Sequence, residues 1–243
     1  MHSAGDRRFR NGIVALLTAL AIIAGSAAGV TGGEILGWGD WVVADPQSVA
    51  DLTGIAAGSY HGLGLTSGGT IVAWGLNDAG QCDVPGPDDG FVAVAGADEH
   101  SLGLRADGSI VAWGANQHGE CDVPSPNSGF VAVAAGGYQS LGLRADGTIV
   151  AWGHDPSVPE PNAGFVSLAA GTQHRVGLRD DGTIVAWGAN WGGQCDVPAP
   201  NGRFVAIAAG GAHTLGLKAD GAVVAWGHDV DGQCDVPVLN QGF

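Results

Sequence analysis

FVAVAAGGYQSLGLRADGTIVAWG, residues 130–153, contains three short apolar runs that are separated by two turns. The runs predict strands at Phe130–Ala135, Ser140–Arg144 and Thr148–Trp152, because β-branched and small apolar residues are typical of strands. Asp146-Gly147, between the second and third runs, is a two-residue hairpin signal, since both residues tolerate positive φ. The segment therefore encodes one small three-stranded antiparallel sheet.

The same unit recurs along the chain. Trp-Gly occurs six times, at intervals of 36, 39, 39, 35 and 39 residues, at Trp38, Trp74, Trp113, Trp152, Trp187 and Trp226. Most connecting loops end in Cys-Asp-Val-Pro, but between Trp152 and Phe165 four residues and the Cys are missing. Such units must stack on one another to bury their apolar faces. Function is then expected in the loops that differ between copies.

Both faces of these strands are apolar or small, which predicts sheets that are covered on both sides. An all-β propeller of packed blades meets this requirement, and a linear β-solenoid is the competing architecture. Glycines at one position of the second strand would allow close approach where the blades converge: Gly103, Gly142, Gly177 and Gly216. The Cys-Asp-Val-Pro piece could add a fourth, short outer strand, which its Pro would keep at an edge.

The repeat resembles the regulator of chromosome condensation repeat. That family's pattern, from Val-x-x-Ala-Ala-Gly-x-x-His to Asp-Gly-x-Val-x-x-Trp-Gly, is matched by Val205 to Gly227, and its loop Trp-Gly-x-Asn-x-x-Gly-Gln by Trp74 to Gln81 and Trp187 to Gln194. The resemblance implies a β-propeller over residues 35–243. The short repeats look like those of compact exported bacterial propellers, including a β-lactamase-inhibitor type in which loops on one face grip a partner enzyme. The nuclear members' exchange and chromatin roles are not expected to transfer.

The strand count predicts five complete blades and a partial sixth. Glu34–Trp38 reads as a lone third strand, and Phe243 stands where a further first strand would begin. In family members, an N-terminal strand of this kind completes the last blade. Either a sixth blade is left incomplete, which is the interpretation that we favour, or a five-bladed ring carries an unmatched N-terminal strand.

Residues 1–28 differ from the rest of the chain. Three arginines precede an apolar run, Ile13 to Ile23, and small residues follow it. This order predicts a secretory signal peptide that is cleaved near Ala28, with residues 29–34 as a short linker. An uncleaved N-terminal anchor is the alternative. Secretion, or export to the periplasm, is therefore expected.

Cleavage would leave 6 basic and 23 acidic residues, a formal charge of −17. This balance argues against nucleic acid, whose phosphates require Lys and Arg, and against an anionic membrane surface. We expect a monomer with a protein partner, and no membrane association after signal cleavage.

Strand direction predicts that the turns after the first strands and the loops after Trp-Gly share one end of the propeller, with the Asp-Gly turns at the other. The first end varies strongly between copies, and Tyr and Trp are frequent interface anchors. The candidate partner-binding residues are all on this end: Tyr60, Asp98, Glu99, His118, Tyr138, His154, Trp191 and His228. Neutral drift of exposed turns is the alternative explanation of this variation.

Two further sets of repeated residues suggest structure rather than chemistry. His61, His100, His174 and His213 share one repeat position, which Gln139 fills in the remaining copy; Gln favours a hydrogen-bonding role over a metal site. Cys82, Cys121, Cys195 and Cys234 are also equivalent, and equivalent points on neighbouring blades lie too far apart for disulfides, so half-buried free thiols are expected. No catalytic constellation, metal site or cofactor motif is predicted.

The sequence thus predicts a secreted, non-catalytic scaffold that binds another protein through one loop face. The alternatives are a module or enzyme that takes a glycan or small molecule at the channel mouth, and a β-lactamase-inhibitor-like protein.

Overall fold

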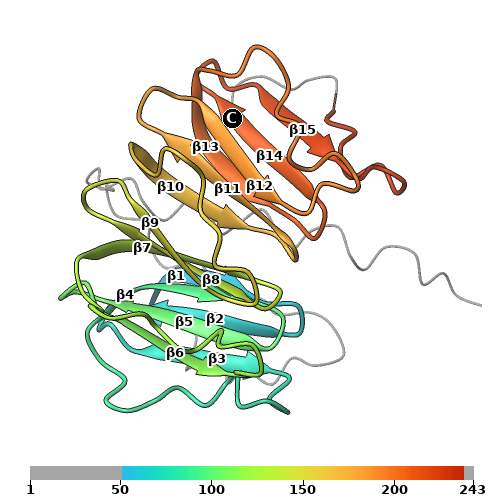
Figure 1. Cartoon of the computed structure of the whole chain (residues 1–243). Helices are drawn as coiled ribbons and strands as arrows, with labels where there is room; N and C mark the ends of the chain where they lie inside the picture. Colours follow the sequence, from blue (N-terminus) through green and yellow to red (C-terminus); the bar gives the residue numbers. More distant parts are fainter. Residues whose placement is uncertain (1–50, 238–243) are drawn as a thin grey trace, which may run out of the picture.

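The computed structural model describes residues 51–237, which form five three-stranded antiparallel sheets (Figure 1). We call these sheets blades 1 to 5 in chain order. Their strands are β1 (Leu52–Ala57), β2 (His61–Thr66) and β3 (Ile71–Gly75); β4 (Phe91–Gly96), β5 (His100–Arg105) and β6 (Ile110–Gly114); β7 (Phe130–Gly136), β8 (Gln139–Arg144) and β9 (Ile149–Gly153); β10 (Phe165–Ala170), β11 (His174–Arg179) and β12 (Ile184–Gly188); and β13 (Phe204–Ala209), β14 (His213–Lys218) and β15 (Val223–Gly227).

The predicted strands of blade 3 are confirmed to within one residue at each end. The optional fourth strand does not form. Instead, Asp122 N donates to Gly119 O and Val123 N to Cys121 O, so the Cys-Asp-Val-Pro piece is a tight turn. The all-β propeller with five complete blades is confirmed, each blade having three strands.

The blades pack in chain order around their first strands, with β1, β4, β7, β10 and β13 lying one against the next. The apolar core sits between blades rather than within them. One core cluster, for example, joins Leu102 and Ile110 of blade 2 to Phe130 and Trp152 of blade 3. No extensive packing of blade 5 on blade 1 occurs among residues 51–237, so the described blades form an open arc.

The repeated glycine of the second strand makes room for an aromatic ring. A Cβ on Gly103 would lie 2.6 Å from Phe91 Cε1 and 3.2 Å from Ile71 Cδ1 of the preceding blade. Both distances are shorter than normal carbon contacts, so the glycine permits the expected close approach.

A β-bulge follows the first residue of each blade, and it corrects one expectation. In blade 2, Phe91 pairs with Arg105 but Ala93 pairs with Leu104, which leaves Val92 as the extra residue. The bulge turns this position outward, so the two faces are not both covered as predicted. Equivalent valines are 48–54 % exposed at Val92, Val131, Val166 and Val205.

The predicted signal peptide (1–28), the linker (29–34), the strand Glu34–Trp38 and Phe243 lie outside the described residues. Within residues 51–237, no helix has the length and apolar character that a membrane span requires.

Candidate functional site

The variable turns and loops meet at one end of each blade, as predicted. The residue after each Trp-Gly donates its backbone N–H to a carbonyl in the turn between the first two strands of the same blade. In blade 3, His154 N donates to Tyr138 O at 3.0 Å, and in blade 1, Leu76 N donates to Tyr60 O at 2.9 Å. The turn and the loop are therefore held side by side.

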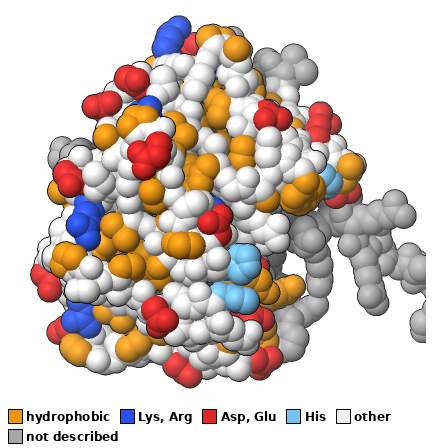
Figure 2. Space-filling model, viewed as in Figure 1, with side chains coloured by type: hydrophobic (Ala, Val, Ile, Leu, Met, Phe, Trp, Pro, Cys, Tyr) orange, Lys and Arg blue, Asp and Glu red, His pale blue; other side chains and the backbone are white. Residues whose placement is uncertain are grey.

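His118, Tyr138 and His154 form one exposed cluster across blades 2 and 3, which we call the His–Tyr cluster. The ring centres of His118 and Tyr138 are 4.9 Å apart, and those of His118 and His154 are 5.2 Å apart, with the two imidazoles nearly perpendicular at 83°. All three side chains are exposed. Figure 2 shows histidine side chains touching one another at the molecular surface.

Trp191 and His228 form a second pair across blades 4 and 5. Their ring centres are 5.3 Å apart, and Trp191 is 66 % exposed. Gln233 Nε2 lies 3.1 Å from His228 Nδ1, so this imidazole has a protein partner that fixes its orientation.

The remaining candidates lie near the junction of blades 1 and 2. Ser59 Oγ donates to Asp98 Oδ1 at 2.5 Å, with Tyr60 and Glu99 exposed beside them. The eight predicted residues thus form three groups, at the junctions of blades 1 and 2, 2 and 3, and 4 and 5, rather than one compact site. Carboxylates are scattered over the surface that Figure 2 shows.

The repeated histidines join neighbouring blades through two consecutive hydrogen bonds, from imidazole to hydroxyl and from hydroxyl to a loop carbonyl, which we call the relay. His100 Nε2 lies 2.9 Å from Ser140 Oγ of the next blade, and Ser140 Oγ donates to Glu120 O at 2.8 Å. Because the serine proton goes to that carbonyl, the imidazole is the donor to the hydroxyl. Burial lowers the pKa of His100 to about 4. The same relay recurs as His61–Ser101–Gln81 and His174–Thr214–Gln194.

The same loop carbonyl also accepts a tryptophan. Trp152 Nε1 donates to Glu120 O at 2.8 Å, alongside the hydroxyl of Ser140. One backbone oxygen therefore accepts hydrogen bonds from two side chains of the next blade. The predicted hydrogen-bonding role of the repeated histidines is confirmed.

The junction between blades 3 and 4 replaces this relay with an ion pair. Gln139 stands in the histidine position, and Arg175 stands where three other copies have Ser or Thr and the first copy has Gly62. Arg175 Nη1 donates to Asp155 Oδ2 at 2.8 Å, and Nη2 donates to Asp155 O; the arginine side chain is fully buried. This hydrogen bond from Arg175 holds the pKa of the Asp155 carboxyl below its usual range.

The cysteines lie half-buried in equivalent loops, each with its Sγ directed at a backbone carbonyl. Burial raises the pKa of the Cys121 thiol to about 12, which disfavours the reactive thiolate. Within residues 51–237, no group of three or more His, Cys, Asp or Glu side chains is placed to hold a metal ion.

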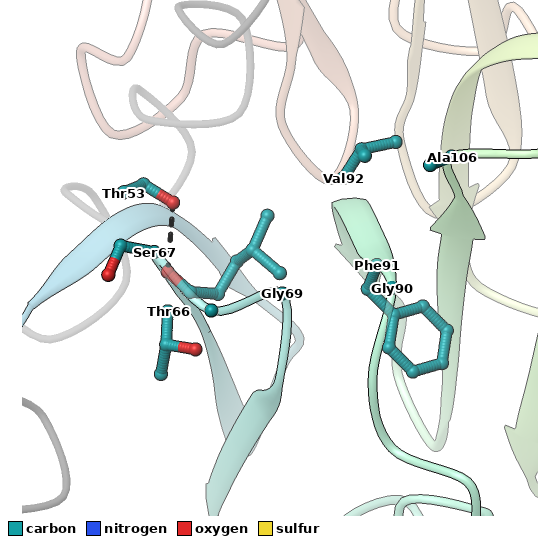
Figure 3. A pocket seen from close by; sticks show the side chains of 10 residues that line it. Thr53, Thr66, Ser67, Gly69, Gly90, Phe91, Val92 and Ala106 are labelled. Atoms are coloured by element: carbon teal, nitrogen blue, oxygen red, sulfur yellow. Dashed lines mark hydrogen bonds between the residues drawn. The ribbon is translucent and has the colours of Figure 1, made fainter.

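Sequence reasoning missed a hollow at the opposite end, near the Asp-Gly turns. A pocket of about 400 Å³ lies between blades 1 and 2, bordered by Thr53, Thr66, Phe91 and Val92 (Figure 3). None of the described residues that line it is ionisable. The sequence feature that marks this hollow is the Val that follows Phe in four copies. Because alternate residues of a strand face opposite sides of the sheet, that Val was expected on a covered face.

The comparisons with known proteins agree with this geometry. The family described as the regulator of chromosome condensation (RCC1) repeat matches residues 53–81, 91–120 and 204–233. No curated protein sequence matches the chain.

Several solved structures are similar. The ectodomain of the receptor kinase CR4 from Physcomitrella patens is 26 % identical, with a TM-score of 0.63 over 71 % of this chain and 52 % of that one. Prp20p from Saccharomyces cerevisiae is 23 % identical, with a TM-score of 0.63 over 75 % and 58 % of the two chains. Human WBSCR16 is 20 % identical, with a TM-score of 0.64 over 78 % and 65 %.

The chain spans between about half and two thirds of the length of these proteins. The matched repeats, the three-stranded blades and the shared fold lead to one assignment. The chain carries regulator of chromosome condensation (RCC1) repeats in three places and has the β-propeller fold of its RCC1 neighbours.

Proposed function

We propose that this protein is an exported, non-catalytic scaffold that binds another protein through the variable loop end of its propeller. The observation that carries the proposal is the exposure of aromatic side chains there. Tyr60 is 67 % exposed, Trp191 66 % and Tyr138 45 %, all on loops that differ between copies.

The packing of the blades does not account for these side chains. The tryptophans of the repeat, such as Trp113 and Trp152, are buried between blades, whereas Trp191 projects from a loop. Rigid Tyr and Trp side chains supply large contact area at small entropic cost, which makes them frequent hot spots of interfaces. Partner binding would bury area that this chain leaves in water.

The fold supports a binding role of this kind. Prp20p, which shares the fold, binds Gsp1p and histones. The identity of those partners is not carried over, because sequence identity of 23 % supports the fold alone.

The alternative of a glycan or small-molecule site at the channel mouth is less well supported. The cavity among the inner strands β4, β7 and β10 has a volume of only about 40 Å³ and is lined by small and aliphatic residues such as Val94, Ala134 and Leu168. Ligand sites are usually several hundred Å³ in volume, at roughly 300–1,000 Å³. This end of the molecule is therefore better suited to bind a protein surface than a glycan or a small molecule.

The experiment is partner capture from the native extracellular fraction, followed by affinity measurement with the purified partner. The double variant Tyr138→Ala/Trp191→Ala should weaken binding by about 30-fold or more, since hot-spot truncations cost about 2 kcal/mol or more. The matched control is Val131→Ala/Val205→Ala, which changes two exposed residues at the opposite end. Undiminished binding by the aromatic variant, or an equal loss in the control, would contradict the proposal. Inhibition kinetics with purified β-lactamases test the inhibitor-like alternative.

A further inference from the structure

We propose that His118 and His154 form a binding site for a divalent transition-metal ion such as Zn²⁺. The two imidazoles come from loops of successive blades, and their ring centres are 5.2 Å apart. Both side chains are exposed, and within residues 51–237 no protein hydrogen bond occupies a ring nitrogen of either one. His228 differs, because Gln233 occupies its Nδ1.

The spacing matches what a shared ion requires. Zinc binds imidazole nitrogen at about 2.0–2.1 Å, usually in tetrahedral geometry, so two imidazoles on one ion have ring centres about 5 Å apart. The observed 5.2 Å agrees with this value. Both rings are exposed, and we expect rotation about their side-chain bonds to turn a nitrogen of each toward the ion.

Each imidazole stands on a loop that a buried charged residue anchors. His118 N donates to Glu120 Oε2 at 2.7 Å, and Glu120 is fully buried. Next to His154, Asp155 accepts hydrogen bonds from the buried guanidinium of Arg175. Fixed loops reduce the entropy that two ligands lose when they bind one ion.

The anchor at Asp155 departs from the repeat, whereas the anchor at Glu120 keeps the repeat's hydrogen bond and changes only the side chain. Glu120 stands where three other copies have Gln81, Gln194 and Gln233, and this places a carboxyl group two residues from His118. The loop that carries His154 is the one that lacks four residues and the Cys. The anchor of the His154 loop is therefore specific to this junction. The anchor of the His118 loop is the bond that Gln81, Gln194 and Gln233 also accept from the backbone N–H two residues before them.

Two protein nitrogens fill half of a tetrahedral shell. The other two positions are left for water or for a ligand from another molecule, and Tyr138 packs beside His118 with ring centres 4.9 Å apart. The described residues supply no third metal-binding side chain here, so the site is weaker than a structural zinc centre. It is independent of the proposed protein partner and is testable without it.

The test is titration of the untagged chain with ZnCl₂, followed by calorimetry and by NMR of the histidine ring nitrogens. We expect one site, with zinc-dependent shifts of the His118 and His154 rings. His118→Gln and His154→Gln should each weaken binding at least tenfold, and the matched control His228→Gln should retain it. Circular dichroism shows whether each exposed substitution leaves the fold intact.

Two results would overturn the proposal. The first is the absence of zinc-dependent shifts at the two rings. The second is unchanged affinity in the double variant His118→Gln/His154→Gln, which would assign the zinc to another group, such as the thiols at Cys121 and its equivalents.

Discussion

Asp155→Ala tests whether the ion pair with Arg175 holds blades 3 and 4 together. The substitution removes a charge-assisted hydrogen bond of 2.8 Å and leaves a guanidinium whose side chain is 0 % exposed without its counter-charge. Removing one partner of a buried pair costs about 3–5 kcal/mol. Because the Asp155 side chain is 43 % exposed, we expect the lower end, about 3 kcal/mol.

A double-mutant cycle separates the ion pair from other effects. Arg175→Met keeps an apolar chain in the buried space and returns the half-exposed carboxylate to water, at a cost of about 1 kcal/mol or less. In the Arg175→Met variant, Asp155→Ala no longer leaves a buried guanidinium without its counter-charge. The coupling energy between the two positions should therefore be about 2 kcal/mol or more.

The assay is urea and thermal unfolding followed by circular dichroism. A loss of about 3 kcal/mol corresponds to a fall in Tm of roughly 6–12 °C for a domain of this size. If Asp155→Ala destabilises the Arg175→Met variant as much as the parent chain, the ion pair contributes nothing. The exchange of the relay for this ion pair would then contribute nothing to the free energy of unfolding.

Three further predictions concern the regular blades. Ser140→Ala leaves the buried His100 Nε2 without its partner and should cost about 1–3 kcal/mol in unfolding free energy, whereas Ser128→Ala at an exposed site should cost little. Trp113→Ala should cost about 3–5 kcal/mol, because Trp113 is 5 % exposed; Trp191→Ala should change the melting temperature little, and equal effects would refute our placement of the two. Burial lowers the pKa of His100 to about 4, against about 6.5 in the unfolded chain, so unfolding takes up a proton between these values. Stability should be complete above pH 6.5 and fall as the pH drops from about 6.5 to about 4. Burial also lowers the pKa of His61 and of His174 to about 4, so His100→Gln, which copies Gln139, should reduce this fall only by the share of one histidine, and an unchanged pH profile would contradict the assignment.

The regular features of the fold were predictable because they repeat. Local signals placed each strand to within a residue in blade 3, since Asp146-Gly147 and the β-branched run after it act over short distances. The hydrogen-bonding role of the histidines was also predictable, because Gln139 shares that chemistry but not the affinity for metals. Copies within one chain can be compared in this way without coordinates.

The bulge at Val92 was not predictable from periodicity. A single extra residue reverses which face a side chain occupies, and nothing in the Phe-Val dipeptide marks it. Reading the strand with an unbroken period of two therefore assigned Val131 to a covered face, whereas it is 48 % exposed.

The end that carries the candidate site was predictable from strand direction, but the groupings within it were not. His118 meets Tyr138 and His154 because the loop of one blade reaches over the turn of the next. Trp191 reaches His228 in the same manner. Which rings touch depends on loop length and side-chain rotamers, and a sequence pattern specifies neither.

The pairing of Asp155 with Arg175 shows what limits divergence in this architecture. In a regular loop, one backbone carbonyl accepts both the tryptophan and the hydroxyl of the next blade, so the loop cannot change without weakening that blade's attachment. In the shortened loop, Ser157 O accepts Trp187 and the ion pair with Arg175 replaces the hydroxyl contact. The loop that carries His154 could depart from the repeat because its neighbour supplied another attachment. A search for functional loops in such proteins should therefore begin at junctions where other interactions have replaced the regular hydrogen bonds between blades.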